Sequence, residues 1–373
     1  MTPALRTRNI APLIILLGVL LMGRAQAAPP QQGPDPNATC LACHTVPGRT
    51  VTLPSGEELS LVVDAQAFAA SAHGQKGVPC LGCHADVGDY PHPPLVANDY
   101  RDFQVDRYRV CRDCHPDQYA ATLDSVHARE LAAGNRNAPL CTDCHGAHNV
   151  VHLAERRANI SLACRQCHAA IFDLYRQSVH GAALLEEANP DVPTCIDCHN
   201  VHSIQDPHQP RFRLTSPEVC GKCHADEALM AKYGISTQVF NTYVADFHGT
   251  TVTLFERESP DQPTNKAVCF DCHGVHDIRP ADDPNSSVVR ENLLQTCRRC
   301  HPDAEANFPA SWTSHFIPDR EHYPLVYYVN LFYAILIPGM IGFMVLFVSL
   351  DALRRLTLRL RRSRRIQEQP ERR

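Results

Sequence analysis

The sequence predicts a mainly helical protein with extensive loops and one C-terminal transmembrane helix. Helix-like stretches such as residues 117–124 alternate with irregular segments, and the 373 residues include 29 prolines. Few continuous apolar runs occur in the body, so we expect a core that forms around something other than aliphatic side chains. Residues 325–350 are different, because they contain no formal charge over a length that exceeds the ~20 residues needed to cross a hydrocarbon core.

The N-terminus has the features of a secretory signal peptide. Arg6 and Arg8 precede an apolar run from Ile10 to Met22, and residues 25–27 offer an A-x-A cleavage site. This apolar run is short for a membrane span, although an uncleaved N-terminal anchor is the alternative. We therefore predict that residues 1–27 are a signal peptide and that residues 28–324 form an exported body.

The charges that flank the predicted transmembrane helix, residues 325–350, indicate its orientation. Residues 352–373, in the tail after it, carry a net charge of +7, whereas residues 28–351 carry a net charge of −15. Positive residues stay on the cytoplasmic side, so the sequence predicts a single-pass protein of the cytoplasmic membrane with an extracytoplasmic or periplasmic body. Beside a membrane span, the basic run at residues 359–365 indicates contact with the lipid bilayer and not with nucleic acid.

All 18 cysteines lie in nine copies of one pattern, Cys-x-x-Cys-His, which we number motifs 1 to 9 in chain order. The copies are Cys40/Cys43/His44, Cys80/Cys83/His84, Cys111/Cys114/His115, Cys141/Cys144/His145, Cys164/Cys167/His168, Cys195/Cys198/His199, Cys220/Cys223/His224, Cys269/Cys272/His273 and Cys297/Cys300/His301.

This spacing is the signature of covalent haem c attachment. Two thiols three positions apart form thioethers with one porphyrin, and the following histidine is the proximal ligand of the iron. Zinc sites and disulfides are the alternatives for paired cysteines in an exported protein. Neither explains why histidine follows the second cysteine in nine cases of nine, so we predict nine haems.

Twelve histidines lie outside these motifs, and nine of them alternate with the motifs along the chain. We expect these nine to be the distal ligands of the irons. They are His73, His92, His127, His148, His180, His202, His248, His276 and His315. His152, His208 and His322 fall outside the alternation, and we expect them to be surface residues.

The distal candidates form two classes, which indicate an internal repeat of about 50–70 residues with two haems each. One class lies in Ser-x-His or a looser version of it. The other lies three residues after a proximal histidine, with His92 as a looser member, eight residues after His84. A helix would separate His115 from His127 by ~18 Å, so these two cannot hold one iron. Each distal histidine should therefore bind a haem from another motif, with the individual pairings left open. Bis-histidine ligation would give low reduction potentials.

With these motifs in view, residues 37–316 resemble the bacterial multihaem cytochromes c with doubled Cys-x-x-Cys-His units. The resemblance implies short helices and loops wrapped around a chain of closely packed haems, with little sheet. Residues 322–333 resemble the anchor of periplasmic multihaem cytochromes that accompany a membrane cytochrome b. Two departures are plain: no Cys-x-x-Cys-Lys motif occurs, and the anchor is C-terminal, whereas the small tetrahaem quinol dehydrogenases have an N-terminal one.

The main functional hypothesis is electron transfer without substrate chemistry, because candidate distal ligands equal the motifs in number. Electrons would pass between a membrane cytochrome b or other quinol-oxidising subunit, near motif 9, and a redox partner protein in the periplasm or outer membrane. The alternative is a reductase of nitrogen or sulfur oxyanions with one open haem, which requires one candidate, most plausibly His92, not to be a ligand. A third reading, an extracellular haem filament, is opposed by the membrane span.

Overall fold

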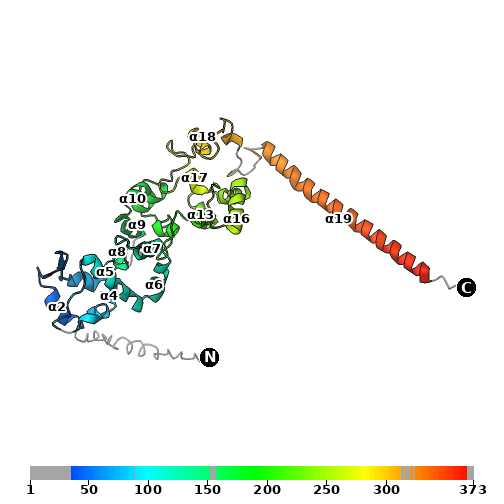
Figure 1. Cartoon of the computed structure of the whole chain (residues 1–373). Helices are drawn as coiled ribbons and strands as arrows, with labels where there is room; N and C mark the ends of the chain where they lie inside the picture. Colours follow the sequence, from blue (N-terminus) through cyan, green and yellow to red (C-terminus); the bar gives the residue numbers. More distant parts are fainter. Residues whose placement is uncertain are drawn as a thin grey trace, which may run out of the picture. The chain divides into compact units, whose positions relative to one another are not determined.

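The computed structural model describes residues 35–88, 90–151, 157–311, 315, 320–321 and 324–367 (Figure 1). The signal peptide predicted at residues 1–27, together with His152 and His322, lies outside the described residues. The described chain is mainly helical, as predicted, and its strands form a single two-stranded sheet.

The chain divides into two compact units that interlock in sequence. The first comprises Met1–Pro116 and Pro139–His152, and the second comprises Asp117–Ala138 and Leu153–Arg373. Motifs 1 to 4 therefore belong to the first unit and motifs 5 to 9 to the second.

The first unit is made of short helices around one antiparallel hairpin, in which Val51 pairs with Leu59. Its elements are α2 (Ala38–His44), β1 (Thr50–Thr52), β2 (Glu58–Ser60), α3 (Ala65–Ala70), α4 (Ala72–Gln75), η1 (Cys80–Gly82), η2 (Ala85–Val87), α5 (Tyr100–Arg107), η3 (Tyr108–Asp113) and α8 (Cys141–His145).

The second unit contains the longer helices. Its elements are α6 (Pro116–Leu123), which starts on the last residue of the first unit, α7 (Val126–Ala132), α9 (Arg157–Arg165), α10 (Ala169–Tyr175), α11 (Val179–Leu185), α12 (Cys195–His199), α13 (Pro210–His224), α14 (Glu227–Ala231), α15 (Gln238–Ala245), α16 (Phe247–Glu258), α17 (Cys269–His273), α18 (Arg290–Arg298), η5 (Pro309–Ser311) and α19 (Pro324–Gln367).

The apolar core is small. Only thirteen hydrophobic residues are buried among the described residues, and the one cluster they form consists of Leu214, Val252 and Val268. Phe255 and Phe270 pack against this cluster from partly buried positions. So few buried side chains supply little of the stabilisation that a chain of this length needs.

The C-terminal helix α19 is long and apolar enough to cross a membrane (Figure 1, orange to red). At 1.5 Å per residue, its 44 residues correspond to roughly 66 Å, about twice the hydrocarbon thickness. The basic tail therefore continues the same helix as far as Gln367. Pro338 lies inside α19, which continues past it as one helix and is drawn without a visible bend in Figure 1. One missing backbone hydrogen bond can be absorbed in a membrane helix without a break.

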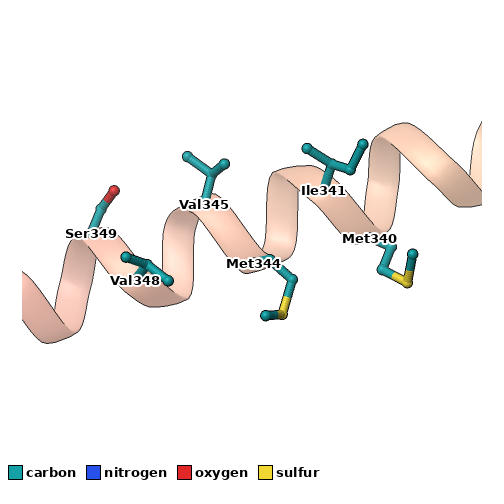
Figure 2. A pocket seen from close by; sticks show the side chains of 6 residues that line it. All are labelled: Met340, Ile341, Met344, Val345, Val348 and Ser349. Atoms are coloured by element: carbon teal, nitrogen blue, oxygen red, sulfur yellow. The ribbon is translucent and has the colours of Figure 1, made fainter.

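A shallow hollow lies along α19 and is lined by six side chains of that helix alone (Figure 2). Met340 and Met344 project on one side, and Ile341 and Val345 project on another. A hollow of this kind is an apolar surface for lipid or a neighbouring helix, because the lining offers one hydroxyl, on Ser349, as its sole polar side chain.

Candidate haem sites

Three of the nine motifs form short helices of their own. α8, α12 and α17 each begin at the first cysteine and end at the histidine, so the two thiols lie one turn apart on the same side. The third residue of each helix is an aspartate whose carboxylate accepts the N–H of the residue before the helix. The N···O distances are 2.7 Å for Leu140 and Asp143, 2.6 Å for Thr194 and Asp197, and 2.7 Å for Val268 and Asp271.

The cysteines fit the attachment of haem better than they fit the two alternatives. None of the 18 is joined in a disulfide. In the part of the chain that the structure describes, no three His, Cys, Asp or Glu side chains converge as a metal site. A structural zinc site requires four such ligands around one point.

The two cysteines of a motif differ in how far the polypeptide covers them. The first cysteine is half-buried in all nine motifs, whereas the second is exposed in seven of them. These exposed second cysteines are Cys43, Cys83, Cys114, Cys144, Cys167, Cys198 and Cys300.

The described polypeptide therefore builds no enclosed pocket around these seven thiols, although the sequence assigned all of them to haem attachment. A covalent thioether does not need an enclosing pocket, so the exposure is compatible with attachment. The assignment of these seven residues to haem stays a prediction.

Within each unit, motifs that are consecutive in the sequence are also close in space. The first cysteines of an odd-numbered motif and of the next motif interact through their thiols. These pairs are Cys40 with Cys80, Cys111 with Cys141, Cys164 with Cys195, and Cys220 with Cys269. In the second pair, the shared hydrogen bond raises the pKa of Cys111 and lowers that of Cys141 to about 7.

The second cysteine of an even-numbered motif lies near the following motif. Although Cys198 is exposed on one side, desolvation by the surrounding protein raises its pKa to about 11, and the neighbouring Cys220 thiol of motif 7 adds to this effect. Desolvation, and then the Cys111 thiol, raise the pKa of Cys83 in the same way. The motifs thus follow one another in order, 1 to 4 in the first unit and 5 to 9 in the second.

Eight proximal histidines each lie beside one distal candidate, with ring centroids 6.0–6.4 Å apart. The pairs are His44 with His92, His84 with His148, His115 with His73, His168 with His127, His199 with His276, His224 with His180, His273 with His315, and His301 with His248. Every pair joins two different segments, as the sequence required.

This separation is the one expected for two imidazoles on opposite sides of a metal ion. A metal–nitrogen bond is about 2 Å, and each ring centre lies about 1 Å beyond its nitrogen, which gives roughly 6 Å between centroids. The remaining proximal histidine, His145, belongs to the first unit, and the remaining distal candidate, His202, belongs to the second. Both make further contacts in the structure.

The direction of each pairing alternates along the chain. In motifs 3, 5, 7 and 9, the partner comes from a Ser-x-His or Asp-x-His segment upstream of the motif. In motifs 2, 6 and 8, the partner lies downstream. Motif 1 has no described histidine before it, and its partner lies downstream as well. All eight paired sites are therefore built from segments that are tens of residues apart.

The serine in Ser-x-His is the N-cap of the helix that carries the distal histidine. Ser71, Ser125 and Ser178 each accept a hydrogen bond from the N–H three residues on, at 3.0–3.1 Å, and all three are buried. Asp246 does the same for α16, accepting from Gly249 N–H at 3.1 Å. The histidine is thus the second residue of its helix, fixed by a cap.

Glycine after the distal histidine allows a close approach to the preceding helix. A Cβ atom at Gly181 would lie 1.9 Å from the carbonyl oxygen of Tyr175, the last residue of α10. Gly74 and Gly249 have the same relation to Phe68 and Tyr243. The distal helix is therefore held against the helix before it.

One class of distal candidates, His148, His202 and His276, lies three residues after a proximal histidine, and we call it the downstream class. In this class a residue with left-handed φ turns the chain between the proximal and the distal histidine. Gly146, Asn200 and Gly274 follow the proximal histidine directly and have φ of 77°, 65° and 83°. The short helix therefore ends at the proximal histidine, and the histidine three residues on does not continue its face. This explains why two histidines so close in sequence serve different sites.

A backbone hydrogen bond recurs between the two classes of segment. The first residue of the capped helix donates its N–H to the carbonyl two residues after a downstream-class histidine, at 2.8 Å each time. These bonds join Ala72 with Val150, Val126 with Ile204, and Val179 with Ile278. The two classes of distal histidine are therefore docked to each other.

An arginine–aspartate ion pair recurs three times as well. Arg101 contacts Asp143 at 2.9 Å, Arg157 contacts Asp197 at 3.0 Å, and Arg213 contacts Asp271 at 2.6 Å. Each arginine precedes an odd-numbered motif, and each aspartate is the capping residue of the next motif. The ion pair therefore joins consecutive haem sites.

The ring environments suit neutral imidazole, the form that binds metals. Burial lowers the pKa of His180 to about 4, and burial also lowers the pKa of its partner His224. The Nδ1 atom of His44 lies 2.8 Å from the carbonyl oxygen of Leu61. Such a bond leaves the other ring nitrogen for a metal and orients the ring.

Two further histidines, His208 and His92, lie at exposed positions. The side chain of His208 is 92% exposed and contacts Asp206, a position that agrees with a surface role. His92 is exposed and yet lies 6.2 Å from His44 by ring centroid. The structure thus places His92, the loosest member of its class by sequence, beside motif 1.

Several residues that build the sites were not recognised from the sequence. They include the arginines of the ion pairs, the aspartates inside the motifs and the left-handed residues after the proximal histidines. The signal for the arginines was present, since Arg101, Arg157 and Arg213 are spaced 56 residues apart. An alignment of the internal repeats would have found them.

Comparison with known proteins gives matches to cytochromes c. The N-terminal region of the NapC/NirT cytochrome c family matches residues 151–209, which contain motifs 5 and 6. A cytochrome c-type protein, NrfB of Escherichia coli O6:H1, is 24% identical over 152 residues, or 36% of this chain and 76% of that protein. No solved structure matches. Together with the repeated attachment motifs, these similarities support a multihaem cytochrome c, a class of protein whose haem c is bound covalently.

Proposed function

We propose that this chain binds nine haems and carries electrons between a quinol-oxidising membrane partner, such as a cytochrome b, and an acceptor in the periplasm or outer membrane, in anaerobic respiration. The observation that carries the proposal is the set of eight histidine pairs, each of which joins a proximal to a distal candidate at 6.0–6.4 Å.

In this proposal the cysteines of each motif hold one haem, the following histidine is its proximal ligand, and the nine distal candidates are the opposite ligands. Haem bound in this way stores and releases one electron at a time. The protein's part is to hold the two imidazoles in place through capped helices, left-handed turns and ion pairs. The sequential order of the motifs within each unit supports stepwise transfer along the chain.

The paired histidines favour an electron carrier over an enzyme. A reductase needs one iron face open for its substrate. The candidate most plausibly absent as a ligand was His92, yet its ring centroid lies 6.2 Å from that of His44, within the 6.0–6.4 Å range of the other pairs. We therefore assign His92 as a ligand and propose no catalytic residue.

The location follows from α19 and the charges around it. We propose that a signal peptide directs export, that α19 anchors the protein in the cytoplasmic membrane, and that its arginine-rich end lies in the cytoplasm. The body, residues 28–324, would then lie on the periplasmic side, where its negative charge steers basic partner surfaces.

Two measurements on the purified full-length protein test the proposal. Native membranes supplied with a water-soluble quinol should reduce the haems of the wild-type protein. Carbon monoxide added to the fully reduced protein should bind none of them, because both faces of each iron are occupied. Stoichiometric carbon monoxide binding would favour the reductase, and failure of quinol to reduce the protein would exclude the proposed donor.

A further inference from the structure

A fourth arginine, Arg290, occupies the sequence position of the arginines that form the ion pairs between consecutive haem sites, but it has no matching aspartate. Arg290 stands seven residues before the first cysteine of motif 9, as Arg157 and Arg213 stand seven residues before those of motifs 5 and 7. It is also the first residue of α18, as Arg157 is the first residue of α9. No cysteine follows Cys300 in the sequence, so no tenth motif offers Arg290 a capping aspartate.

The environment of Arg290 leaves it available to a partner. Its side chain is exposed, and no hydrogen bond or ion pair joins it to any other described residue. Arg298 and Arg299, at the other end of α18, are exposed as well and donate to backbone carbonyls, at 2.9 Å to Ala304 and 3.3 Å to Asp271. Glu291 is the one acidic residue of this helix. The region around motif 9 therefore exposes three arginines, although the body as a whole is acidic.

This end of the second unit is tethered close to the membrane anchor. The His315 ring centroid lies 6.3 Å from that of His273, which ties residue 315 to motif 8. Only eight residues lie between His315 and Pro324, where α19 begins. That segment spans at most about 30 Å even when fully extended. Motif 8, and motif 9 packed beside it, therefore lie near the membrane surface if α19 is inserted.

We infer that Arg290 is the docking residue for a carboxylate on the extracytoplasmic face of the membrane-bound electron donor. The inference rests on the proposed function. The chemistry is that of the internal repeat, where Arg213 binds Asp271 through both guanidinium nitrogens, at 3.1 and 2.6 Å. The donor would supply in trans the carboxylate that the next motif supplies elsewhere, and complementary charge would set the register of the two proteins.

The test compares Arg290→Glu with wild type in native membranes that contain the donor, with a water-soluble quinol as reductant. We expect the rate of haem reduction to fall about tenfold or more, because a like charge replaces an attractive one at the contact. Arg176→Glu is the matched control, since Arg176 is also an exposed arginine, 55% by side chain, and pairs within its own helical segment with Asp173. It should reduce at the wild-type rate. Dithionite should reduce both variants fully, which checks that all haems are present.

The outcomes separate this inference from the proposed function. If quinol reduces the wild-type protein and Arg290→Glu equally fast, the docking role is wrong and the proposed function stands. If quinol reduces neither, the proposed donor itself is wrong. Slower oxidation by a soluble acceptor, with normal reduction, would place a different partner on this surface and overturn the inference. The inference would also be overturned if Arg290→Glu were reduced slowly in native membranes but at the wild-type rate in membranes reconstituted with phosphatidylcholine alone. That result would mean that Arg290 contacts anionic lipid and not the donor.

Discussion

At the scale of single residues, a capped histidine is the unit from which four of the nine distal positions are built. The cap satisfies a helix N–H and places the histidine as the second helical residue, where the ring projects from a rigid position. For two of the four, His127 and His180, burial lowers the pKa of the ring and so favours the neutral form that binds metals. The proposed role of each distal histidine can be tested one site at a time.

Replacing His180 by alanine should open one haem of the nine. His180 is the partner of His224, so the iron of motif 7 would lose one ligand. We expect one high-spin haem per protein by electron paramagnetic resonance and one equivalent of carbon monoxide bound after reduction. Added imidazole should restore the low-spin signal.

The control for this variant is His208→Ala, whose side chain is 92% exposed. It should leave all spectra unchanged. A fully low-spin His180→Ala protein would show that His180 is not a ligand.

The cap itself can be tested at Asp246, the aspartate that replaces serine before His248. Asp246→Ala removes the acceptor of the Gly249 N–H and should cost about 1 kcal/mol of stability. Thermal unfolding followed by circular dichroism would show the lower midpoint. Asp246→Asn keeps a capping oxygen without the charge and should unfold close to wild type; equal losses in both variants would assign the effect to charge instead.

The attachment motifs and the alternation of histidines were readable from the sequence because they depend on local spacing. The pairing was not, because it depends on which segments dock. His73 and His115 are 42 residues apart and His199 and His276 are 77 residues apart, and nothing in local sequence links them. We expect neighbouring histidines to serve different irons, and the left-handed residues that follow the proximal histidines give a physical reason for that expectation.

At the scale of elements, the short helices are held together by backbone contact and by ion pairs more than by apolar packing. Glycine permits the closest of these contacts, where α11 meets the end of α10. The arginine–aspartate pairs then join one haem site to the next. We therefore expect a loss of stability when either the glycine contact or an ion pair is removed.

Gly181→Ala should destabilise the protein by about 1–3 kcal/mol. The added methyl group would lie 1.9 Å from the Tyr175 carbonyl oxygen, so one of the two helices must move. Gly88→Ala is the control, because a Cβ atom there meets nothing within 4 Å. Thermal unfolding of both variants decides the matter: similar midpoints would mean that the two helices are not in close contact.

Arg213→Gln should cost about 1–2 kcal/mol, because the pair with Asp271 is half-buried, with side chains 24% and 25% exposed. Arg211→Gln, two residues away, removes a pair with Asp261 whose side chains are 64% and 77% exposed, and should cost almost nothing. A double-mutant cycle with Asp271→Asn would isolate the pairwise term. A coupling near zero would show that the ion pair does not join motifs 7 and 8.

At the scale of the whole molecule, the described chain buries too little apolar surface to fold without its cofactors. The sequence indicated this through its few apolar runs and many prolines, and the thirteen buried hydrophobic residues agree with it. The long apolar helix α19 was equally readable, because its length and lack of charge are local properties. The division into two units was not, because residues 117–138 and 139–152 belong to different units although they adjoin in sequence.

The haem-free chain should therefore be largely unfolded. Produced without its N-terminal 27 residues, in a compartment where haem is not attached, it should show weak helical circular dichroism and rapid proteolysis. A stable, protease-resistant haem-free body would mean that the polypeptide holds its fold by packing alone.

The intact mass of the purified full-length protein, combined with a count of thiols that react with an alkylating agent, tests the central claim most directly. The account predicts a mass increased by nine haem groups and no reactive thiol, because every cysteine, including those that the polypeptide leaves exposed, forms a thioether. Fewer added groups, or cysteines that alkylate freely, would contradict it.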